Sequence, residues 1–336
     1  MGRGSRHVCV EGDPNQVDSF VACLVAVLNA WDRPVSYDWV AGLAGITFSP
    51  VLNPGENCTA WWMEAGSDSR IDSLGRALGF TVAQVTREAV WDDGAREVYA
   101  TTGMLPAPHE DHFARLSAAF DRGDAIVLRT WPAWSLIVGW TRDLDQLPFA
   151  TVPGFEELVA SIWGPAQAQL VYLLNPMPGD LSVEEAVCDA LCYGAAVAGG
   201  QGEESSLRYG AALYVAAAER MKSEYFCPEC REHSDSCAHR TLMRMLGTQR
   251  SAVGFLHDAQ SLIGCDLPWE PVIDRFVTMA EVTSVYCGWA EFQENWPNEG
   301  YRKHLSNDLR TLAALQTKAA GVLAELSGAF ERQIAG

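Results

Sequence analysis

The fold is decided mainly by residues 19–48, which read SFVACLVAVLNAWDRPVSYDWVAGLAGITF. Asp18 and Ser19 precede an apolar run with helical spacing, and both residue types are good helix N-caps. After Pro34, a second and shorter helix is predicted over residues 36–43. The stretch therefore predicts two helices joined by a tight turn.

Strand-like runs dominate the chain between these helices and residue 180. Apolar and polar residues alternate in several of the runs, and two of them lie close enough in sequence to form a hairpin. The predicted strands are residues 80–85, 125–130, 134–141 and 169–174. We therefore expect residues 1–180 to form an α+β domain with a small antiparallel sheet.

The remaining chain has the pattern of helices alone. Ser182 and Glu185 are spaced as a helix capping box, which predicts a helix that runs to about Ala198. The later stretches 207–223, 239–262, 270–292 and 301–333 are also predicted as helices, and in one of them Val272, Phe276 and Met279 recur with a helical period. We therefore expect residues 181–336 to form an all-α domain.

The charge of the chain excludes several classes of partner. The sequence has 336 residues, and 43 acidic against 24 basic residues give a net charge of -19. Such a field repels the phosphates of nucleic acids and anionic lipids, so we expect neither nucleic acid nor a membrane as partner. The sequence shows no secretory signal, no apolar run of about 20 residues and no phosphate-binding glycine loop. We therefore expect a cytoplasmic protein without a nucleotide cofactor.

Three stretches are similar, in order and pattern, to parts of one protein family. Residues 19–48 contain its first helix, turn and second helix. WPAWSLIVGW (131–140) resembles the strand that carries its catalytic histidine, and LVYLLNP (170–176) resembles its last strand. The family is that of papain-like domains of the butirosin biosynthesis protein H N-terminal type, distant relatives of the C39 peptidases. The resemblance implies a papain-like N-terminal domain, and RSAVGFL (250–256) is similar to the helical portion that follows in longer relatives.

The resemblance also implies where a catalytic site would lie. In such domains a cysteine at a helix N-terminus is activated by a histidine, and a third polar side chain orients the imidazole. In this chain the nucleophile position falls near Ser19, with Cys23 about one turn deeper, and Asn175 matches the orienting residue. The histidine position falls at Ala133 or Trp134, so the Cys/His dyad is lost.

Other residues could replace the missing histidine. His109 and His112 lie in a predicted loop and could fold over the site as a general base. Each candidate also has a purely structural interpretation. Cys23 is then a buried apolar thiol, Ser19 a helix cap, and the two histidines are solvated loop residues.

Two functions follow from these alternatives. The first is a pseudoenzyme that binds a small molecule, a peptide or a partner protein in the former catalytic cleft. A homodimer is one of the alternatives for the partner. The second is an acyltransferase, amide-forming or hydrolytic enzyme of a biosynthetic pathway. In that enzyme Cys23 or Ser19 carries the acyl group, His109 or His112 is the base, and Asn175 orients the base.

Tryptophans are concentrated in the α+β half of the chain. Several rings beside a vacated cleft would form a flat-walled pocket for an apolar or aromatic ligand. The alternative is that the rings fill the core. The candidate ligand-binding residues are Trp61, Trp62, Trp131 and Trp134.

A cysteine-rich segment, CPECREHSDSCAH (227–239), is the clearest local motif. Two cysteines spaced as CxxC can occupy adjacent corners of a tetrahedral Zn²⁺ site, and a filled site of this kind is structural. The alternative is an exposed loop of reduced thiols. The candidate ligands are Cys227, Cys230, Cys237 and either His239 or His233.

A second pair of cysteines lies earlier in the helical half. Cys188 and Cys192 are four residues apart in the predicted helix after Ser182, so they share one helix face. They are either a pair of metal ligands or packed core residues.

Overall fold

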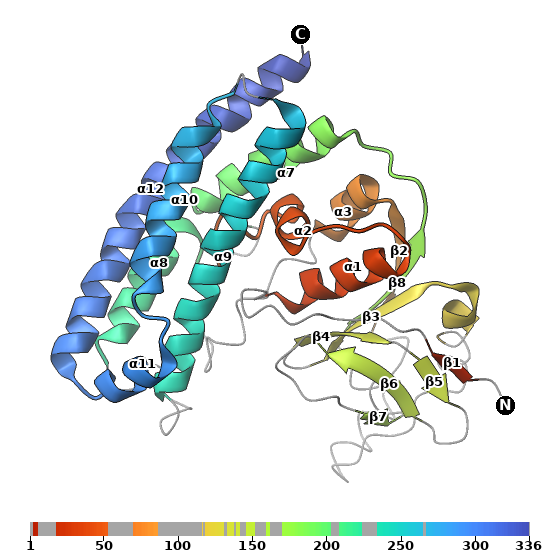
Figure 1. The fold of residues 1–336 in the computed structure, drawn as a ribbon, viewed down its shortest axis with the longest axis horizontal. Helices are drawn as coiled ribbons and strands as arrows, with labels where there is room; N and C mark the ends of the chain where they lie inside the picture. The colour runs from red at the N-terminus through yellow and green to blue at the C-terminus, as the bar shows by residue number, and fades with distance from the viewer. Residues whose placement is uncertain are drawn as a thin grey trace. The chain divides into compact units, whose positions relative to one another are not determined.

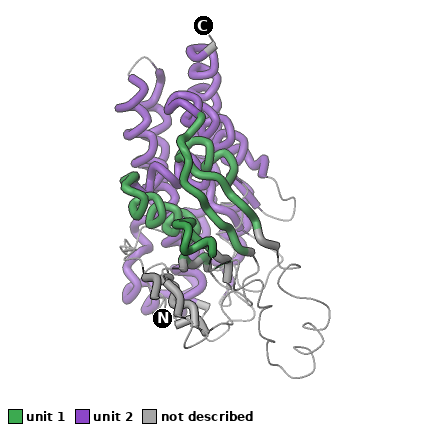
Figure 2. The backbone as a smooth tube through the Cα atoms, turned by 90° about the vertical axis from the view of Figure 1, so that its right-hand side faces the viewer, with its two compact units in different colours: residues 1–35, 71–180 green, residues 36–70, 181–336 purple. Residues whose placement is uncertain are grey.

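The computed structural model describes the backbone of most of the chain. The described residues are 3–5, 18–52, 70–86, 116, 118–130, 133–137, 139–141, 146–151, 159–161, 170–202, 208–223, 234–264 and 267–335. The chain divides into two compact units, coloured separately in Figure 2. Unit 1 comprises residues 1–35 and 71–180, and unit 2 comprises residues 36–70 and 181–336.

The segment after the first helix belongs to unit 2, whereas the sequence placed it in the N-terminal domain. Its helix α2 (Tyr37–Leu43) packs on α9 (Ser234–Ile263), and the ring centroids of Trp39 and Phe255 lie 5.3 Å apart. A glycine at position 42 permits this approach, because a Cβ on Gly42 would overlap the Phe255 ring. The units therefore differ from the two sequential domains that were expected, because the packing partner of α2 lies far along the chain.

Unit 1 combines an antiparallel sheet with helices, which confirms the α+β class. The strand order is β1-β5-β6-β4-β3-β8-β2, with β7 paired to β6, and every pairing is antiparallel. The predicted hairpin is β3–β4, and the run predicted at residues 134–141 is divided between β4 and β5. The elements are α1 (Ser19–Ala30), α3 (Ile71–Leu78), β1 (Arg3–Ser5), β2 (Phe80–Thr86), β3 (Ala125–Thr130), β4 (Ala133–Ile137), β5 (Gly139–Thr141), β6 (Gln146–Thr151), β7 (Val159–Ser161) and β8 (Leu170–Pro176).

Helix α1 lies against the sheet of unit 1 and contacts β4 (Figure 1). Nine of its twelve residues are buried, which is expected of a helix that is apolar on nearly all sides. At its N-terminal end Phe20 lies 4.8 Å from Trp134, and Trp134 stacks on Tyr172 of β8 at 5.4 Å between ring centroids. These three rings form the aromatic core of the α1–β4 junction.

Unit 2 is helical in its described residues apart from an isolated bridge between Leu52 and Arg208. The capping box predicted at Ser182 and Glu185 is present. The stretch predicted as one helix, residues 270–292, forms two, because the chain turns before Gly288, a weak helix former that is the N-cap of the second. The remaining helices are α7 (Val183–Ala198), α8 (Gly210–Met221), α10 (Trp269–Ser284), α11 (Trp289–Asn295) and α12 (Glu299–Ala335).

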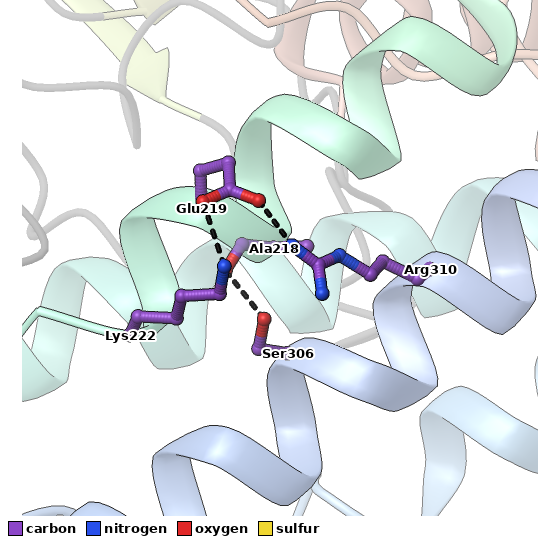
Figure 3. A network of polar contacts seen from close by, with 5 residues as sticks. All are labelled: Ala218, Glu219, Lys222, Ser306 and Arg310. Atoms are coloured by element: carbon purple, nitrogen blue, oxygen red, sulfur yellow. Dashed lines mark hydrogen bonds and ion pairs between the residues drawn. The ribbon is translucent and has the colours of Figure 1, made fainter.

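Helices α8 and α12 pack side by side and are joined by the polar contacts drawn in Figure 3. The buried Ser306 hydroxyl donates a 2.8 Å hydrogen bond to the carbonyl of Ala218. On the exposed side, Glu219 accepts hydrogen bonds from Lys222, at 2.8 Å, and from Arg310. The Lys222 pair lies within α8 and its C-cap, so the polar contacts drawn between the two helices are the Ser306 bond and the Arg310–Glu219 pair. Water screens the exposed ion pair, so the buried Ser306 bond is the stronger of the two. None of the described helices is both long and apolar enough to cross a lipid bilayer.

Candidate functional site

The N-terminal end of α1 is closed by β4. Asp18 is the N-cap of the helix, and its Oδ1 accepts a 2.9 Å hydrogen bond from the Val21 amide. The cap is therefore Asp18, and Ser19 is the first helical residue. The hydroxyl oxygen of Ser19 accepts a 2.9 Å hydrogen bond from the backbone N–H of Trp134. Ser19 is only 3% exposed, so this bond lies in the core.

Cys23 lies one turn further into the same helix. It is 1% exposed, and its neighbours along α1 include the fully buried Phe20, Leu24 and Val27. A thiolate in such apolar surroundings would be poorly stabilised. The structure thus gives Cys23 the environment of a buried apolar thiol.

Asn175 lies away from the tip of α1 along the sheet. Trp134 is paired with Arg129 on β3, and Arg129 is paired with Leu170 on β8. Asn175 is five residues beyond Leu170 (170 to 175), which at roughly 3.4 Å per residue is about 17 Å along the strand. Its Nδ2 instead donates a 2.9 Å hydrogen bond to Asp124 Oδ1. The structure therefore does not bring Asn175 to the position of an imidazole-orienting residue beside Trp134.

Trp134 itself is a core residue. It occupies the position at which the resemblance places a histidine, it is 1% exposed, and its ring contacts Phe20 and Tyr172, which also contact each other. A side chain that is 1% exposed cannot also line a ligand pocket in this conformation. Among the four candidate tryptophans it is the only one within the described residues.

Several predicted site residues lie outside the described residues, so their roles stay predictions. They are Trp61, Trp62, His109, His112, Trp131, Cys227, Cys230 and His233.

The two described candidates for the zinc site lie on α9 and diverge. Cys237 and His239 are two residues apart in a continuous helix, which separates their side chains by about 200° around the axis. Cys237 is buried, whereas the His239 ring packs on Trp289 and Phe292 at 5.0 and 5.2 Å between centroids. One tetrahedral ion cannot take both side chains as ligands in this geometry.

His239 has a structural role in unit 2. Its Nε2 lies 3.0 Å from the carbonyl oxygen of Cys287 and is the donor of that hydrogen bond, because a carbonyl can only accept. Burial lowers the pKa of His239, against smaller opposing effects of the Cys287 carbonyl and of Asp235. The ring is therefore a neutral linker between α9 and α11. No group of three or more His, Cys, Asp or Glu side chains within the described ranges is arranged to hold a metal ion.

The cysteine pair on α7 is a cluster whose surroundings the sequence could not reveal. Cys188 and Cys192 lie one turn apart on α7, close enough for each to influence the pKa of the other, and both residues are only partly buried. Burial, followed by the charge of a Cys192 thiolate, raises the pKa of Cys188 to about 12. On α12, Ser327 Oγ lies 3.0 Å from Cys192 Sγ, and Glu331 Oε1 accepts a 3.3 Å hydrogen bond from the same thiol. The four-residue spacing was the only signal in the sequence.

Comparison with known proteins does not identify a family. No protein-family model matches the chain, and no curated protein shows significant sequence similarity to it.

Proposed function

We propose that this chain is a non-catalytic binding protein, a papain-like pseudoenzyme whose nucleophile and histidine positions have become part of the core. The observation that supports it best is the buried hydrogen bond from the Trp134 N–H to Ser19 Oγ. At the two positions where a dyad would stand, this chain has a packed aromatic ring and a hydroxyl that is already used as an acceptor.

The chemistry of acyl transfer argues in the same direction. A serine or cysteine nucleophile needs a general base within hydrogen-bond reach and a path for the substrate. Ser19 and Cys23 are both almost completely buried, and Asn175 is bonded to Asp124 about 17 Å along the strand from the level of Trp134. An acyltransferase using these residues would need α1 to separate from β4 before each turnover.

The ligand that best fits the proposal is an apolar or aromatic small molecule. The candidate binding residues Trp61, Trp62 and Trp131 offer flat apolar surfaces, and the net charge of -19 disfavours anionic ligands. A peptide or a protein partner is the other class of ligand that such aromatic side chains bind. The described cysteines are not joined in disulfides, which is in keeping with a reducing compartment such as the cytoplasm.

Covalent chemistry at the α1 tip can be tested with an activated ester. The full-length protein is incubated with p-nitrophenyl acetate, and acetylated residues are located by peptide mass mapping. We expect no acetyl group on Ser19 or Cys23 and no burst of p-nitrophenol that depends on either residue. Stoichiometric acetylation of Ser19 or Cys23, abolished by S19A or C23A, would favour the acyltransferase instead.

Binding can be tested with the neutral aromatic dye Nile red. We expect saturable fluorescence enhancement that W131A or W61A weakens at least about tenfold, an effect of ~1.4 kcal/mol. The control is W289A, which removes a partly exposed tryptophan of unit 2. Enhancement that is equally sensitive to W289A, or absent altogether, would contradict an aromatic-walled site.

We also propose a structural Zn²⁺ in the cysteine-rich segment, with Cys227, Cys230, Cys237 and His233 as ligands. The divergence of Cys237 and His239 on α9 supports His233 over His239. Metal analysis of the purified protein should find about one equivalent of zinc. C227S and H233Q should lose it, whereas H239Q should retain it. Loss of zinc in H239Q alone would reverse the assignment.

A further inference from the structure

Cys188 and Cys192 place two sulfur atoms on one partly buried face of α7. The residues are four apart in a continuous helix, so one helical turn places the two side chains next to each other. Both are only partly buried, which leaves them open to a small ion from solvent. This differs from Cys23, whose thiol is shut inside the core of unit 1.

The neighbouring helix supplies polar groups of the kind that surround a bound cation. Ser327 of α12 is buried, and its hydroxyl lies 3.0 Å from Cys192 Sγ, so it can donate a hydrogen bond to a thiolate there. The Glu331 carboxylate lies 3.3 Å from the same sulfur and adds negative charge. Glu331 is exposed, so its side chain can turn toward water when the thiol proton leaves.

We propose that Cys188 and Cys192 form a two-thiolate site for a soft monovalent cation, Cu⁺, on the surface of unit 2. Thiolates are the ligands that Cu⁺ prefers among protein side chains. Binding joins the copper to both sulfurs, breaks both S–H bonds and releases two protons to solvent, so no electron is transferred. The bound group carries one negative charge, which the Ser327 hydroxyl stabilises at Cys192.

The number of ligands selects the metal. A structural Zn²⁺ site takes four protein ligands in a tetrahedron, whereas two thiolates on one helix turn provide only a pair of donors. Ser327 and Glu331 both contact Cys192, whereas Glu331 acts on Cys188 through its charge. The pair therefore suits an ion that two sulfurs satisfy, and this site is separate from the zinc proposed for residues 227–237.

Protection from alkylation locates the copper despite the ten cysteines of the chain. Reduced full-length protein is titrated anaerobically with Cu⁺ as its acetonitrile complex, treated with N-ethylmaleimide, and mapped by mass spectrometry. We expect Cys188 and Cys192 to be protected together, about tenfold when free Cu⁺ is ten times its dissociation constant. The internal control is Cys287, a partly buried thiol hydrogen-bonded to the Thr283 carbonyl, whose rate should not change. Unchanged rates at the α7 pair, or protection of only one thiol, would overturn the proposal.

Variants separate the pair from the other thiols. C188S should abolish protection of Cys192, and C192S should abolish protection of Cys188, while C287S and the double variant C227S/C230S should retain both. Far-UV circular dichroism checks that each variant is folded. If a serine variant does not fold, the wild-type labelling result still decides. Full protection of Cys192 in folded C188S would show that the two sulfurs do not act as a pair.

Discussion

The nucleophilic side chains of the two units differ in their exposure to solvent. In unit 1, Ser19 and Cys23 lie at a helix end where a catalytic residue is expected, but each is almost completely buried. In unit 2, Cys188 and Cys192 lie in the middle of a helix and remain partly exposed beside polar groups of α12. Residue type and position in an element therefore do not define a site by themselves. Access and polar partners decide whether a thiol can react or bind.

The difference has a simple origin in the helices that carry these residues. Helix α1 is apolar on nearly all sides, so packing against the sheet hides whatever polar group it contains. Helix α7 keeps a polar face with Glu184, Glu185 and Asp189, so side chains at its edge stay within reach of solvent.

The largest effect should come from the aromatic core of unit 1. W134A removes a fully buried ring that stacks on Tyr172 and packs against Phe20, and it should lower the free energy of unfolding by about 3–5 kcal/mol. Urea denaturation monitored by circular dichroism measures the loss. The matched control is W289A, since Trp289 is 41% exposed and should cost clearly less. Equal losses for the two variants would mean that the α1–β4 junction is not a close-packed core.

A smaller loss should follow removal of the Ser19 hydroxyl. S19A deletes the acceptor of the buried Trp134 N–H bond, which typically costs about 1–3 kcal/mol. S36A is the control, because Ser36 is the exposed N-cap of α2 and its loss should cost about 1 kcal/mol. A neutral S19A would show that the hydroxyl is not a structural acceptor and would reopen its use as a nucleophile.

The decrease in the free energy of unfolding at acid pH should depend on His239. Burial lowers the pKa of His239 in the folded protein. Below about pH 6.5 the unfolded chain therefore binds more protons than the folded protein, and the free energy of unfolding decreases as the pH decreases. One such group contributes at most about 1.4 kcal/mol per pH unit. We expect the profile of H239Q between pH 7 and 5 to be flatter than that of H257Q, which changes an exposed histidine of the same helix. Parallel profiles would contradict the buried, neutral state of His239.

The smallest predicted effect lies at alkaline pH. The raised pKa of Cys188, about 12, means that the folded protein keeps a proton which the unfolded chain releases near pH 9. Stability is therefore present below pH 9 and is lost as the pH rises toward 12. C188A should show a shallower fall in the free energy of unfolding between pH 9 and 10.5 than the wild type. C287A is the comparison, because burial is the only effect that raises the pKa of the Cys287 thiol.

Local elements could be predicted well because they depend on local chemistry. The capping box at Ser182, the strand from Phe80 and the hairpin of β3 and β4 were all visible in the sequence. The grouping of α2 with α9 was not, because it depends on the contact of Trp39 with Phe255, more than two hundred residues away. The break between α10 and α11 was missed because a single glycine only weakly disfavours a helix.

The candidate sites show the same limit. The sequence placed Ser19 at the tip of α1, but it could not show that the Trp134 amide would occupy its oxygen. It also showed Cys188 and Cys192 on one helix face. Their surroundings depend on Ser327 and Glu331, which approach only when α12 packs on α7. Long-range packing, which no local pattern encodes, decides both sites.

The closed α1–β4 junction is tested most directly by the labelling rate of Cys23. N-ethylmaleimide modification of the native protein at pH 8 is followed by peptide mass mapping and compared with the rate in urea. A thiol released only by unfolding of unit 1 should react at least about a thousandfold more slowly in the native protein, corresponding to ~4 kcal/mol for opening. Rapid labelling of Cys23 in the folded protein, within tenfold of the unfolded rate, would contradict the account.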